Sequence, residues 1–588
     1  MKSLAYLNKY FIKYRLRFLL GIVFVTLSNL FGIIPAKLIQ RSIDLVNEGN
    51  TPRVYNTILL LLLAYIGATL LKGFLLFLMR QTLIVMSRHI EFDLKNEIYA
   101  HYQHLSLSFY RKNNTGDLMA RISEDVSRVR MYLGPAIMYS INLVVLFIFI
   151  LGSMLMVNVK LTLFVLTPLP ILSILIYKIS ETINIRSEKV QFHLSALSTY
   201  VQEAFSGIRV LKSFIRESSS VEAFDKECAV YRDRSMELVQ VNAFFAPMIM
   251  LLMGFSTLLT VYIGGEDVIA HKMSIGHIAE FIVYLNMLTW PVAAVGWTTS
   301  LIQRAAASQR RINEFLDTQS EIISVSAEGP DISGKLEFEN VSFVYPDSGI
   351  KALNDISFTI PAEGSLGIMG RTGSGKSTIA NLIARLYDVS SGSVLIDEGK
   401  ISKLPVHQLR KHIGYVPQDV FLFSDTIANN ILFGLEHQNL SESERSQLAE
   451  WASKQAVIYD NIKTFPEGFE TLVGERGITL SGGQKQRISI ARALVKQPKI
   501  LLLDDCLSAV DTQTEDAILK NLKSLMKKST TVIISHRATS VKDCDRIIFL
   551  EGGRIVEQGT HTELLMKKGQ YSTLYYQQLK ENAEQTEL

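Results

Sequence analysis

The chain has 588 residues, of which 48% are hydrophobic and only 20% charged, and its mean hydropathy is +0.21. Soluble chains carry about 25% charged residues. The net charge of +4 is an average over two unlike halves: residues 1–320 contain 31 Lys and Arg against 22 Asp and Glu, whereas residues 321–588 contain 29 Lys and Arg against 34 Asp and Glu. With only three scattered cysteines (Cys228, Cys506 and Cys544), these figures exclude a secreted disulfide-stapled protein, a disordered chain and a strongly basic nucleic-acid binder, and favour a partly membrane-embedded protein of a reducing compartment.

Six apolar segments in the first half are each long enough to cross a hydrocarbon core of ~30 Å, which takes about 20 helical residues. They lie at about 18–40, 56–80, 133–157, 161–178, 242–263 and 278–302. Basic residues without an acidic one precede the first segment, at Lys2, Lys9, Lys13, Arg15 and Arg17. The positive-inside rule therefore predicts a cytoplasmic N-terminus.

Two long connections separate these segments, at residues 87–130 and 181–241. Both are polar, helically patterned and free of Gly/Pro clusters, so we interpret them as membrane helices that extend into the cytoplasm and turn back as hairpins. The turns are expected near 109–116 and 204–209. The alternative is a pair of merely amphipathic surface loops.

A few residues inside the predicted spans are unusual for a membrane interior. Lys72 lies near the middle of the second span, where an unpaired cation costs at least about 2.5–3.5 kcal/mol. It should face either a structural partner or a polar substrate cavity, and the sequence does not choose between them. Trp290 and Trp297 lie seven residues apart on one face of the sixth span. Packing or interfacial anchoring is favoured for them over stacking on a substrate.

The character of the chain changes after the last apolar segment. Residues 319–334 form a polar linker, and from Lys335 onward strand-like and helix-like segments alternate, which predicts a soluble α/β domain. The expected organisation is therefore a helical transmembrane domain at 1–318, a linker at 319–334 and an α/β domain at 335–588.

The decisive motif of the second half is a phosphate-binding loop of the pattern GxxxxGK[ST]. It follows a predicted strand at 365–369, precedes a predicted helix at 378–387, and consists of Gly370, Arg371, Thr372, Gly373, Ser374, Gly375, Lys376, Ser377 and Thr378. Glycines allow backbone N–H groups to wrap phosphate oxygens at a helix N-terminus. Lys376 is expected to reach the β- and γ-phosphates of a nucleotide, and the Ser377 hydroxyl to ligate Mg²⁺.

A second strand, at residues 500–505, is apolar on both faces, as a central parallel strand should be. Asp504 at its carboxyl end is placed to hold Mg²⁺ through water. Asp505 follows directly and would point toward the γ-phosphate, where a carboxylate can polarise an attacking water molecule. A purely structural role for Asp505 is a substantial alternative.

Between these elements lies the run Leu480-Ser481-Gly482-Gly483-Gln484. With this LSGGQ run the second half resembles the ATP-binding cassette of ABC transporters, whose signature it is. Ser481 and the glycine amides open a helix and so offer a second anion site. In the family this site closes over the γ-phosphate held by the opposing cassette, so the resemblance implies a dimer.

The remaining cassette motifs occur in the order that the resemblance requires. Tyr345 matches the aromatic residue that stacks on adenine, and Gln418 the glutamine that contacts Mg²⁺ and relays to the membrane domain. His536 matches the switch histidine that holds the γ-phosphate. Residues 508–511 match the cross-dimer loop, and 474–477 the segment with which exporters meet their intracellular loops.

Six spans followed by one cassette resemble an ABC exporter half-transporter, closest to the multidrug-type bacterial exporters. The resemblance implies ATP and Mg²⁺ as ligands, a multi-pass location in the plasma membrane with the N-terminus and cassette in the cytoplasm, and a drug-like or amphipathic substrate. Alternatives with the same ATP-binding cassette are a lipid or peptide translocator and an ATP-gated channel or regulator. DNA-repair ATPases share the signature but lack membrane spans, so no nucleic acid is expected as a partner.

One position departs from the family pattern, because Asp505 stands where a glutamate is usual. Aspartate is shorter by one methylene, roughly 1.5 Å of reach, and a misplacement near 1 Å can cost about 10²-fold in rate. We therefore favour a heterodimer in which this chain contributes a degenerate, slow site and its intact signature completes the fast site of a partner. A homodimer in which Asp505 is an adequate base is the alternative.

Overall fold

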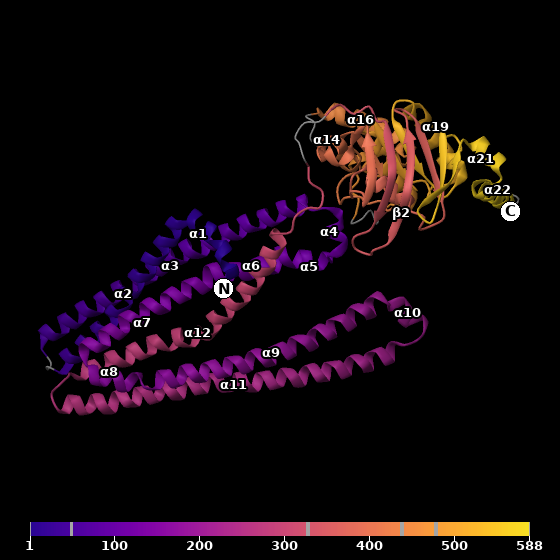
Figure 1. Cartoon of the computed structure of the whole chain (residues 1–588). Helices are drawn as coiled ribbons and strands as arrows, with labels where there is room; N and C mark the ends of the chain where they lie inside the picture. Colours follow the sequence, from indigo (N-terminus) through magenta and orange to yellow (C-terminus); the bar gives the residue numbers. More distant parts are fainter. Residues whose placement is uncertain (1, 48–50, 325–329, 436–439, 475–479, 587–588) are drawn as a thin grey trace. The chain divides into compact units, whose positions relative to one another are not determined.

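The computed structural model describes residues 2–47, 51–324, 330–435, 440–474 and 480–586 (Figure 1). The chain divides into two compact units. The helical unit comprises Met1–Gln103 and Gly116–Thr318, and the α/β unit comprises His104–Thr115 and Gln319–Leu588. The α/β unit thus includes a short segment from within the first half of the sequence.

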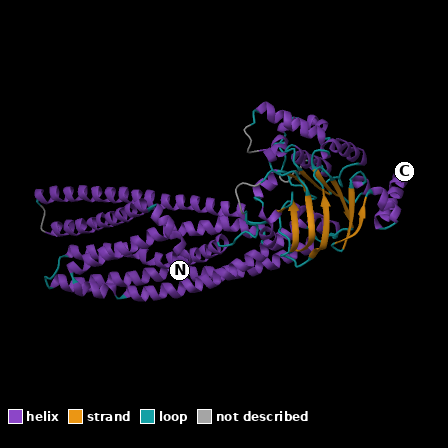
Figure 2. Ribbon diagram, turned by 45° about the horizontal axis from the view of Figure 1, so that its top comes forward, coloured by secondary structure: helices purple, strands orange, loops and turns teal. Residues whose placement is uncertain are grey.

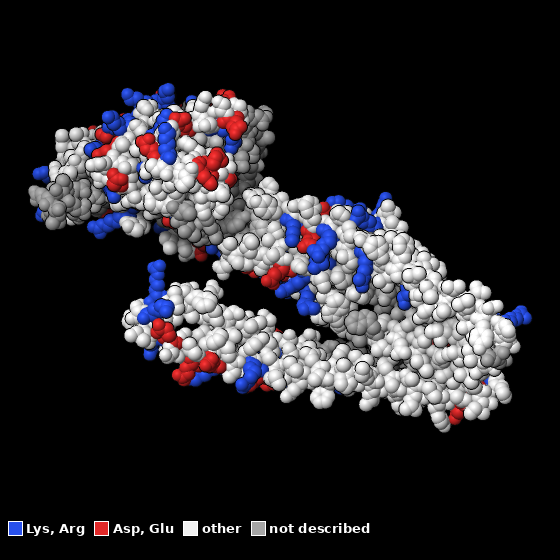
Figure 3. Space-filling model, turned by 180° about the vertical axis from the view of Figure 1, so that it is seen from behind, with Lys and Arg blue, Asp and Glu red and all other residues white. Residues whose placement is uncertain are grey.

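Long helices form the helical unit: α2 (Arg15–Asn47), α3 (Pro52–His104), α7 (Ile137–Val157), α9 (Pro168–Ser206), α11 (Glu217–Ile269) and α12 (Ile275–Leu316). Among the described residues, five helical stretches are long and apolar enough to cross a membrane: 15–47, 52–104, 115–157, 217–269 and 275–316. Their apolar side chains are widely exposed, for example Leu60 and Leu70 at 68% and 70%. Figure 3 shows a broad uncharged surface over one end of this unit. Such a surface requires lipid or another apolar partner.

The predicted fourth span is helical in two consecutive pieces and is not one of these five stretches, a search that covered the described residues alone. Residues 161–178 are divided between α8 (Val159–Leu166) and α9, with Thr167 between them. Pro168 is the first residue of α9, and a proline there lacks the N–H that would continue the preceding helix. The side chains at 169, 172, 173, 176 and 177 lie outside the described residues.

The two long connections are helical, which confirms the hairpin interpretation over surface loops. The first turns through α4 (Leu107–Lys112) before α5 (Thr115–Ala120), and the second turns through α10 (Ile208–Ser213). Figure 1 shows α9 and α11 side by side, with α10 at their tip. Tyr200 of α9 donates a hydrogen bond to the Ser220 carbonyl of α11 at 2.9 Å.

Polar contacts at helix ends tie the helical unit together. Lys13 of α1 (Asn8–Lys13) pairs with Asp93 of α3 at 2.6 Å. Near the start of α12, the Asp44 carboxylate accepts hydrogen bonds from the Gly276 N–H at 2.9 Å and the Ser274 hydroxyl at 2.7 Å. The Gly276 N–H lies in the first turn of α12 and has no carbonyl partner within that helix, so Asp44 of α2 satisfies a backbone donor there. Residues 121–136, which connect α5 to α7, form η2 (Arg121–Asp125), α6 (Val126–Met131) and η3 (Tyr132–Ala136).

The α/β unit contains two sheets, drawn in orange in Figure 2. The four-stranded antiparallel sheet has the order β2-β1-β4-β5 and the bounds β1 (Leu336–Val344), β2 (Lys351–Ile360), β4 (Ser391–Ile396) and β5 (Gly399–Lys400). The six-stranded sheet has the order β10-β9-β3-β8-β7-β6 and the bounds β3 (Ser365–Gly370), β6 (Ile413–Val416), β7 (Ile500–Asp504), β8 (Thr530–Ile534), β9 (Arg546–Glu551) and β10 (Arg554–Gly559).

Strands β3, β7 and β8 are buried along their whole length, as parallel strands covered on both faces should be. They pair in parallel as β3-β8-β7, so their carboxyl ends meet at one edge of the sheet. In open α/β sheets, ligands bind beyond this edge.

Helices complete the α/β unit around the two sheets. They are α13 (Lys376–Ile383), α14 (Val406–Lys411), α15 (Ile427–Leu432), α16 (Glu442–Gln455), α17 (Tyr459–Thr464), α18 (Gly482–Leu494), α19 (Thr512–Met526), α20 (Ala538–Val541), α21 (His561–Lys567) and α22 (Gln570–Thr586). Two apolar clusters form the core. One is centred on α15, α16 and α18, and the other lies between the two sheets and α13.

Candidate nucleotide site

The phosphate-binding loop connects β3 to α13. Helix α13 begins at Lys376, two residues before the predicted start, and ends at Ile383. Gly375 has φ +100°, and a Cβ at that position would collide with the Ala352 carbonyl oxygen. A left-handed backbone that also passes this close to another chain segment requires glycine, which explains the residue at this step of the loop.

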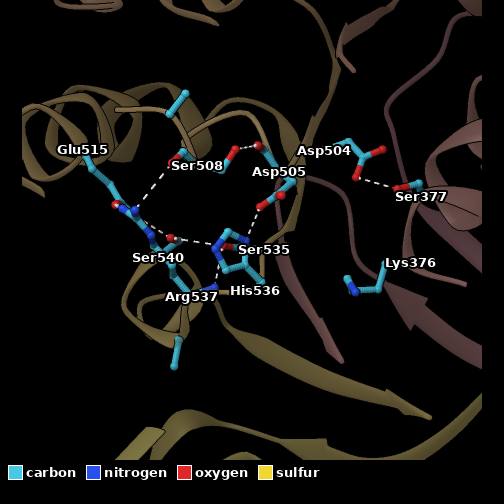
Figure 4. Close-up of polar contacts among 12 residues, drawn as sticks. Lys376, Ser377, Asp504, Asp505, Ser508, Glu515, Ser535, His536, Arg537 and Ser540 are labelled. Atoms are coloured by element: carbon cyan, nitrogen blue, oxygen red, sulfur yellow. Dashed lines mark hydrogen bonds and ion pairs between the residues drawn. The ribbon is translucent and has the colours of Figure 1, made fainter. Parts of the chain in front are cut away.

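The two polar residues that open α13 have different partners, one within the loop and one at the end of β7. The Lys376 ammonium donates hydrogen bonds to the carbonyls of Gly370 and Arg371, both at 2.8 Å. Ser377 donates to an Asp504 carboxylate oxygen at 3.0 Å, as Figure 4 shows. Burial lowers the pKa of Lys376, while the nearby carboxylates oppose that shift. The loop is therefore connected directly to the end of β7.

Asp504 is the last residue of β7 and only 2% exposed. Burial raises the pKa of its carboxyl to about 6, and the neighbouring Asp505 adds to the rise. The Ser377 hydroxyl, the Asp504 carboxylate and Gln418 line the same cavity, and these are oxygen donors of the kind that Mg²⁺ prefers. The donor set therefore fits a magnesium ion.

Asp505 does not extend the strand as predicted. Its φ is +47° and its N–H donates to the Ile534 carbonyl at 2.9 Å, so the chain turns directly after Asp504. Aspartate tolerates this left-handed conformation better than most residues. The turn brings an Asp505 oxygen within 2.7 Å of His536 Nδ1 (Figure 4). This hydrogen bond raises the pKa of His536.

Tyr345 directly follows β1 and contacts the last residue of the phosphate-binding motif. Its hydroxyl shares a hydrogen bond of 2.9 Å with Thr378 Oγ1. Phe343 and Tyr387 lie nearly perpendicular to its ring, at centroid distances of 4.9 and 5.5 Å. The guanidinium carbon of Arg111 lies 5.1 Å from the ring centroid. Tyr345 is thus held in place by its neighbours at the rim of the phosphate-binding loop.

A cavity of about 450 Å³ brings most of the predicted residues together: Tyr345, Thr372, Gly373, Ser374, Gly375, Lys376, Ser377, Thr378, Gln418, Asp504, Asp505 and His536. Gly370 and Arg371 line the neighbouring cavity of about 700 Å³. The other residues that line the 450 Å³ cavity are Arg111, Ser348, Ile350, Ala352 and Ile534, which were not predicted from the sequence. The strand positions follow from the topology, but no sequence signal connects Arg111, more than 200 residues away, to this cavity.

The predicted signature residues Ser481, Gly482, Gly483 and Gln484 do not line this cavity. Ser481 caps α18, and its side chain and that of Gln484 form a reciprocal capping box. This arrangement satisfies backbone donors at the start of α18. The signature therefore opens a well-defined helix on a separate part of the unit.

Hydrogen bonds connect the signature helix to Asp505. Gln486 of α18 donates to the Ser508 hydroxyl at 3.2 Å and accepts from the Ala509 N–H at 3.0 Å. Ser508 in turn donates to the Asp505 carbonyl at 3.0 Å. Asp511, the last residue of this loop, caps α19 through the Thr514 N–H. The predicted cross-dimer loop thus joins the signature helix to the end of β7.

Three other predicted features are placed as follows. Of the segment 474–477, residues 475–477 lie outside the described residues, as does the side chain of Trp290. Trp297 packs edge-on against Tyr139 at 5.5 Å and also lines a cavity with Arg80. Lys72 packs on Gly32 of α2, and none of the described residues forms an ion pair with it.

Comparisons with known proteins identify both halves of the chain. The model of the ABC transporter transmembrane region matches residues 18–292, and that of the ABC transporter matches residues 353–508. The probable multidrug resistance ABC transporter ATP-binding/permease protein YheI of Bacillus subtilis is 36% identical over 579 residues, which cover 97% of each chain. The multidrug resistance-like ATP-binding protein MdlA of Escherichia coli is 33% identical over 98% of this chain and 97% of its own.

Two further similarities cover most of the chain. The ATP-dependent lipid A-core flippase of Syntrophus aciditrophicus is 35% identical over 88% of this chain and 86% of its own. The structure of a bacterial Atm1-family ABC exporter with ATP bound superposes with a TM-score of 0.79 at 27% identity, covering 96% of this chain and 99% of that chain.

These similarities confirm the expectations of a helical transmembrane domain joined to an α/β cassette and of ATPase-coupled export. The chain is a multi-pass inner-membrane protein with its cassette in the cytoplasm, and as a half-transporter it acts in a dimer. It belongs to the ABC transporter family, with a transmembrane region and an ATP-binding cassette in one polypeptide.

Proposed function

We propose that ATP binds in the 450 Å³ cavity, with its adenine base on Tyr345 and its phosphates on residues 370–378. One observation carries this proposal: the phosphate-binding loop, the Ser377–Asp504 pair and Tyr345 come from separate segments of the chain but line one cavity. Lys376 now donates to two loop carbonyls. Phosphate oxygens would replace these carbonyls as acceptors and give the ammonium a charged partner.

Ser377 and Asp504 are the residues proposed to hold Mg²⁺, with Gln418 as a further contact. Mg²⁺ usually binds through one or two carboxylates together with substrate phosphates and water. That the described residues contain no cluster of three or more metal-binding His, Cys, Asp or Glu side chains agrees with a site completed by the nucleotide. When bound, Mg²⁺ would neutralise charge on the phosphates.

Asp505 is proposed to orient the attacking water, and His536 to position the Asp505 carboxylate and contact the γ-phosphate. The 2.7 Å hydrogen bond between them supports a shared role. Because aspartate falls short of the usual glutamate by roughly 1.5 Å, we propose that this chain's own site hydrolyses ATP slowly.

A slow site makes a second, different half-transporter the favoured partner. The signature at 481–484 is complete and forms a capped helix start, so it is suited to the partner's nucleotide, while a partner glutamate would serve the other site. Co-purification with the half-transporter of an adjacent reading frame tests this. We expect a stable 1:1 complex with faster hydrolysis per cassette than the lone chain. A lone chain that forms homodimers as active as the mixed complex would contradict the proposal.

The proposed substrate is drug-like or amphipathic. YheI and MdlA carry multidrug resistance in their names, whereas the lipid A-core flippase makes lipid translocation the second candidate. Vesicles that contain the transporter can compare ATP-dependent uptake of a fluorescent drug-like dye with flipping of a fluorescent phospholipid. Dye transport without lipid flipping supports the first candidate, and the reverse supports the second.

We also propose the domain limits 1–318, 319–334 and 335–588, with the hairpins of α3–α5 and α9–α11 as the elements that transmit cassette closure. Closure on ATP would select an outward-facing arrangement of the spans.

The nucleotide site itself is tested by equilibrium ATP binding to the full-length chain. We expect Lys376→Ala to weaken binding by more than tenfold because it removes the charged phosphate contact. Lys400→Ala is the matched control, since this exposed lysine on β5 does not line the cavity. Unchanged binding by Lys376→Ala would contradict the proposed site.

A further inference from the structure

A short helix from the first cytoplasmic hairpin is built into the α/β unit. Helix α4 (Leu107–Lys112) lies between α3 and α5 in the sequence, yet residues 104–115 cluster with the cassette. Leu107 packs against the core around the two sheets. Ser108 donates to Glu321 at 2.6 Å, and Lys112 lies 3.6 Å from the same carboxylate. Leu107 and Ser108 thus hold α4 on the cassette, whereas the Lys112 ion pair is long and exposed and contributes little.

A fourth residue of this helix, Arg111, enters the nucleotide cavity. Its guanidinium carbon lies 5.1 Å from the ring centroid of Tyr345 and 5.9 Å from that of Tyr387. Arg111 and Tyr345 line the same cavity as the phosphate-binding loop, and the guanidinium lies over the tyrosine ring. This is a cation–π contact of favourable geometry.

The distance decides whether a base can share this side of Tyr345 with Arg111. Stacked groups approach to roughly 3.5 Å, so a base between the guanidinium and the ring would need about 7 Å. The observed separation is 5.1 Å. Adenine stacking on Tyr345 and the present Arg111 contact therefore exclude each other.

We propose that Arg111 occupies the adenine position on Tyr345 in the nucleotide-free site and that ATP binding displaces it, an inference that rests on the proposed binding of ATP in this cavity. Arg111 is then a competitor of the base and a determinant of ATP affinity. Because only two linking residues and Leu107 to Tyr110 separate Arg111 from the end of α3, nucleotide occupancy changes how α4 holds the first hairpin. By reciprocity, any movement of the hairpin that withdraws Arg111 tightens ATP binding by the same factor.

The test measures equilibrium binding to the full-length chain by calorimetry, in EDTA so that ATP is not hydrolysed. The variant Arg111→Ala removes the contact with Tyr345. A cation–π contact at a partly exposed site is expected to change affinity about two- to fivefold, so this variant should bind ATP two- to fivefold more tightly. Lys112→Ala is the matched control, because Lys112 pairs with Glu321 and does not line the cavity. Its ATP affinity should equal that of the wild type.

Inorganic triphosphate separates competition with the base from loss of a positive charge. It lacks a base, so Arg111→Ala should not bind it more tightly. An unchanged or weakened ATP affinity in Arg111→Ala overturns the proposal, because it places Arg111 beside the bound base or outside its path. Tighter binding of ATP and triphosphate alike overturns it as well. Failure of the proposed function gives a different result, in which Lys376→Ala binds ATP as well as the wild type.

Amide hydrogen exchange of α4 gives a second readout that does not depend on affinity. ATP should increase exchange in residues 107–112 of the wild type, because it removes the contact between Arg111 and Tyr345. In Arg111→Ala, exchange should already be high without ATP and should change little when ATP is added. Exchange in the wild type that is unaffected by saturating ATP would overturn the displacement.

Discussion

Replacing Asp504 with asparagine should stabilise the nucleotide-free chain while removing its capacity to hold Mg²⁺. Asp504 is 2% exposed, and burial raises the pKa of its carboxyl to about 6. An aspartate whose folded pKa is raised destabilises the fold above its unfolded pKa, because ionisation is easier in the unfolded chain. Asparagine keeps the oxygen that accepts from Ser377 and has no charge to bury.

The magnitude follows from the shift of the Asp504 pKa from 3.8 to about 6. At 1.36 kcal/mol per unit, the ionised carboxylate costs about 3 kcal/mol at pH 8. The penalty begins above the unfolded pKa and is complete above the folded one, so at pH 5 roughly half of it is present. For a domain larger than 150 residues, each kcal/mol corresponds to roughly 2–4 °C in Tm.

The assay is thermal unfolding of the full-length chain without nucleotide, with wild type and Asp504→Asn compared at pH 8 and pH 5. We expect Asp504→Asn to unfold at least about 5 °C above the wild type at pH 8, with a clearly smaller difference at pH 5. Added MgATP should then stabilise only the wild type. A variant that unfolds at or below the wild-type temperature at pH 8 would refute the reasoning.

Three further substitutions test separate parts of the site. Gly375→Ala places a side chain on a backbone of φ +100° and against the Ala352 carbonyl oxygen. Calorimetry should therefore detect no ATP binding, and Tm should fall by several degrees. Normal ATP binding by this variant would contradict the requirement for glycine at this position. In Asp505→Asn the pKa of His536 should fall toward 6.5, measured by NMR titration, because its hydrogen bond to the carboxylate raises that pKa. The stabilisation from protonated His536 is full below pH 6.5 and lost as pH rises through the raised pKa, so an unchanged titration would exclude the pair. Ser481→Ala removes the N-cap of α18 and should lower the free energy of unfolding by about 1 kcal/mol, measured by denaturant unfolding. Ser481→Asn keeps a capping side chain and should retain the wild-type stability.

Local sequence signals predicted the parts of the site that depend on one short segment. The loop between β3 and α13 and the position of Asp504 at the end of β7 follow from motif and hydrophobic pattern, because a buried parallel strand and a helix N-terminus together dictate where a phosphate can bind. The direct contact of Asp505 with His536 needed the register of β7 and β8, which hydropathy does not carry.

Other features could not be predicted because they depend on tertiary contacts or on backbone detail. The predicted fourth span is hydrophobic enough to cross a membrane, but its helix is interrupted at Thr167, directly before Pro168. A hydropathy window does not detect the one backbone N–H that proline lacks. Asp505 directly follows the apolar strand in the sequence, but its backbone leaves the strand with φ +47°. Arg111 is one of many basic residues in a hairpin tip, and only the packing of α4 on the cassette reveals its contact with Tyr345.

We propose that Asp505 makes this chain's own nucleotide site slow. The most direct measurement is the ATP hydrolysis rate of the purified lone chain, with Asp505→Glu and Asp505→Asn beside the wild type. We predict slow hydrolysis by the wild type and an increase in Asp505→Glu on the order of tenfold or more, because the longer side chain restores about 1.5 Å of reach. Brisk hydrolysis by the wild type that Asp505→Asn abolishes and Asp505→Glu does not raise would contradict the claim.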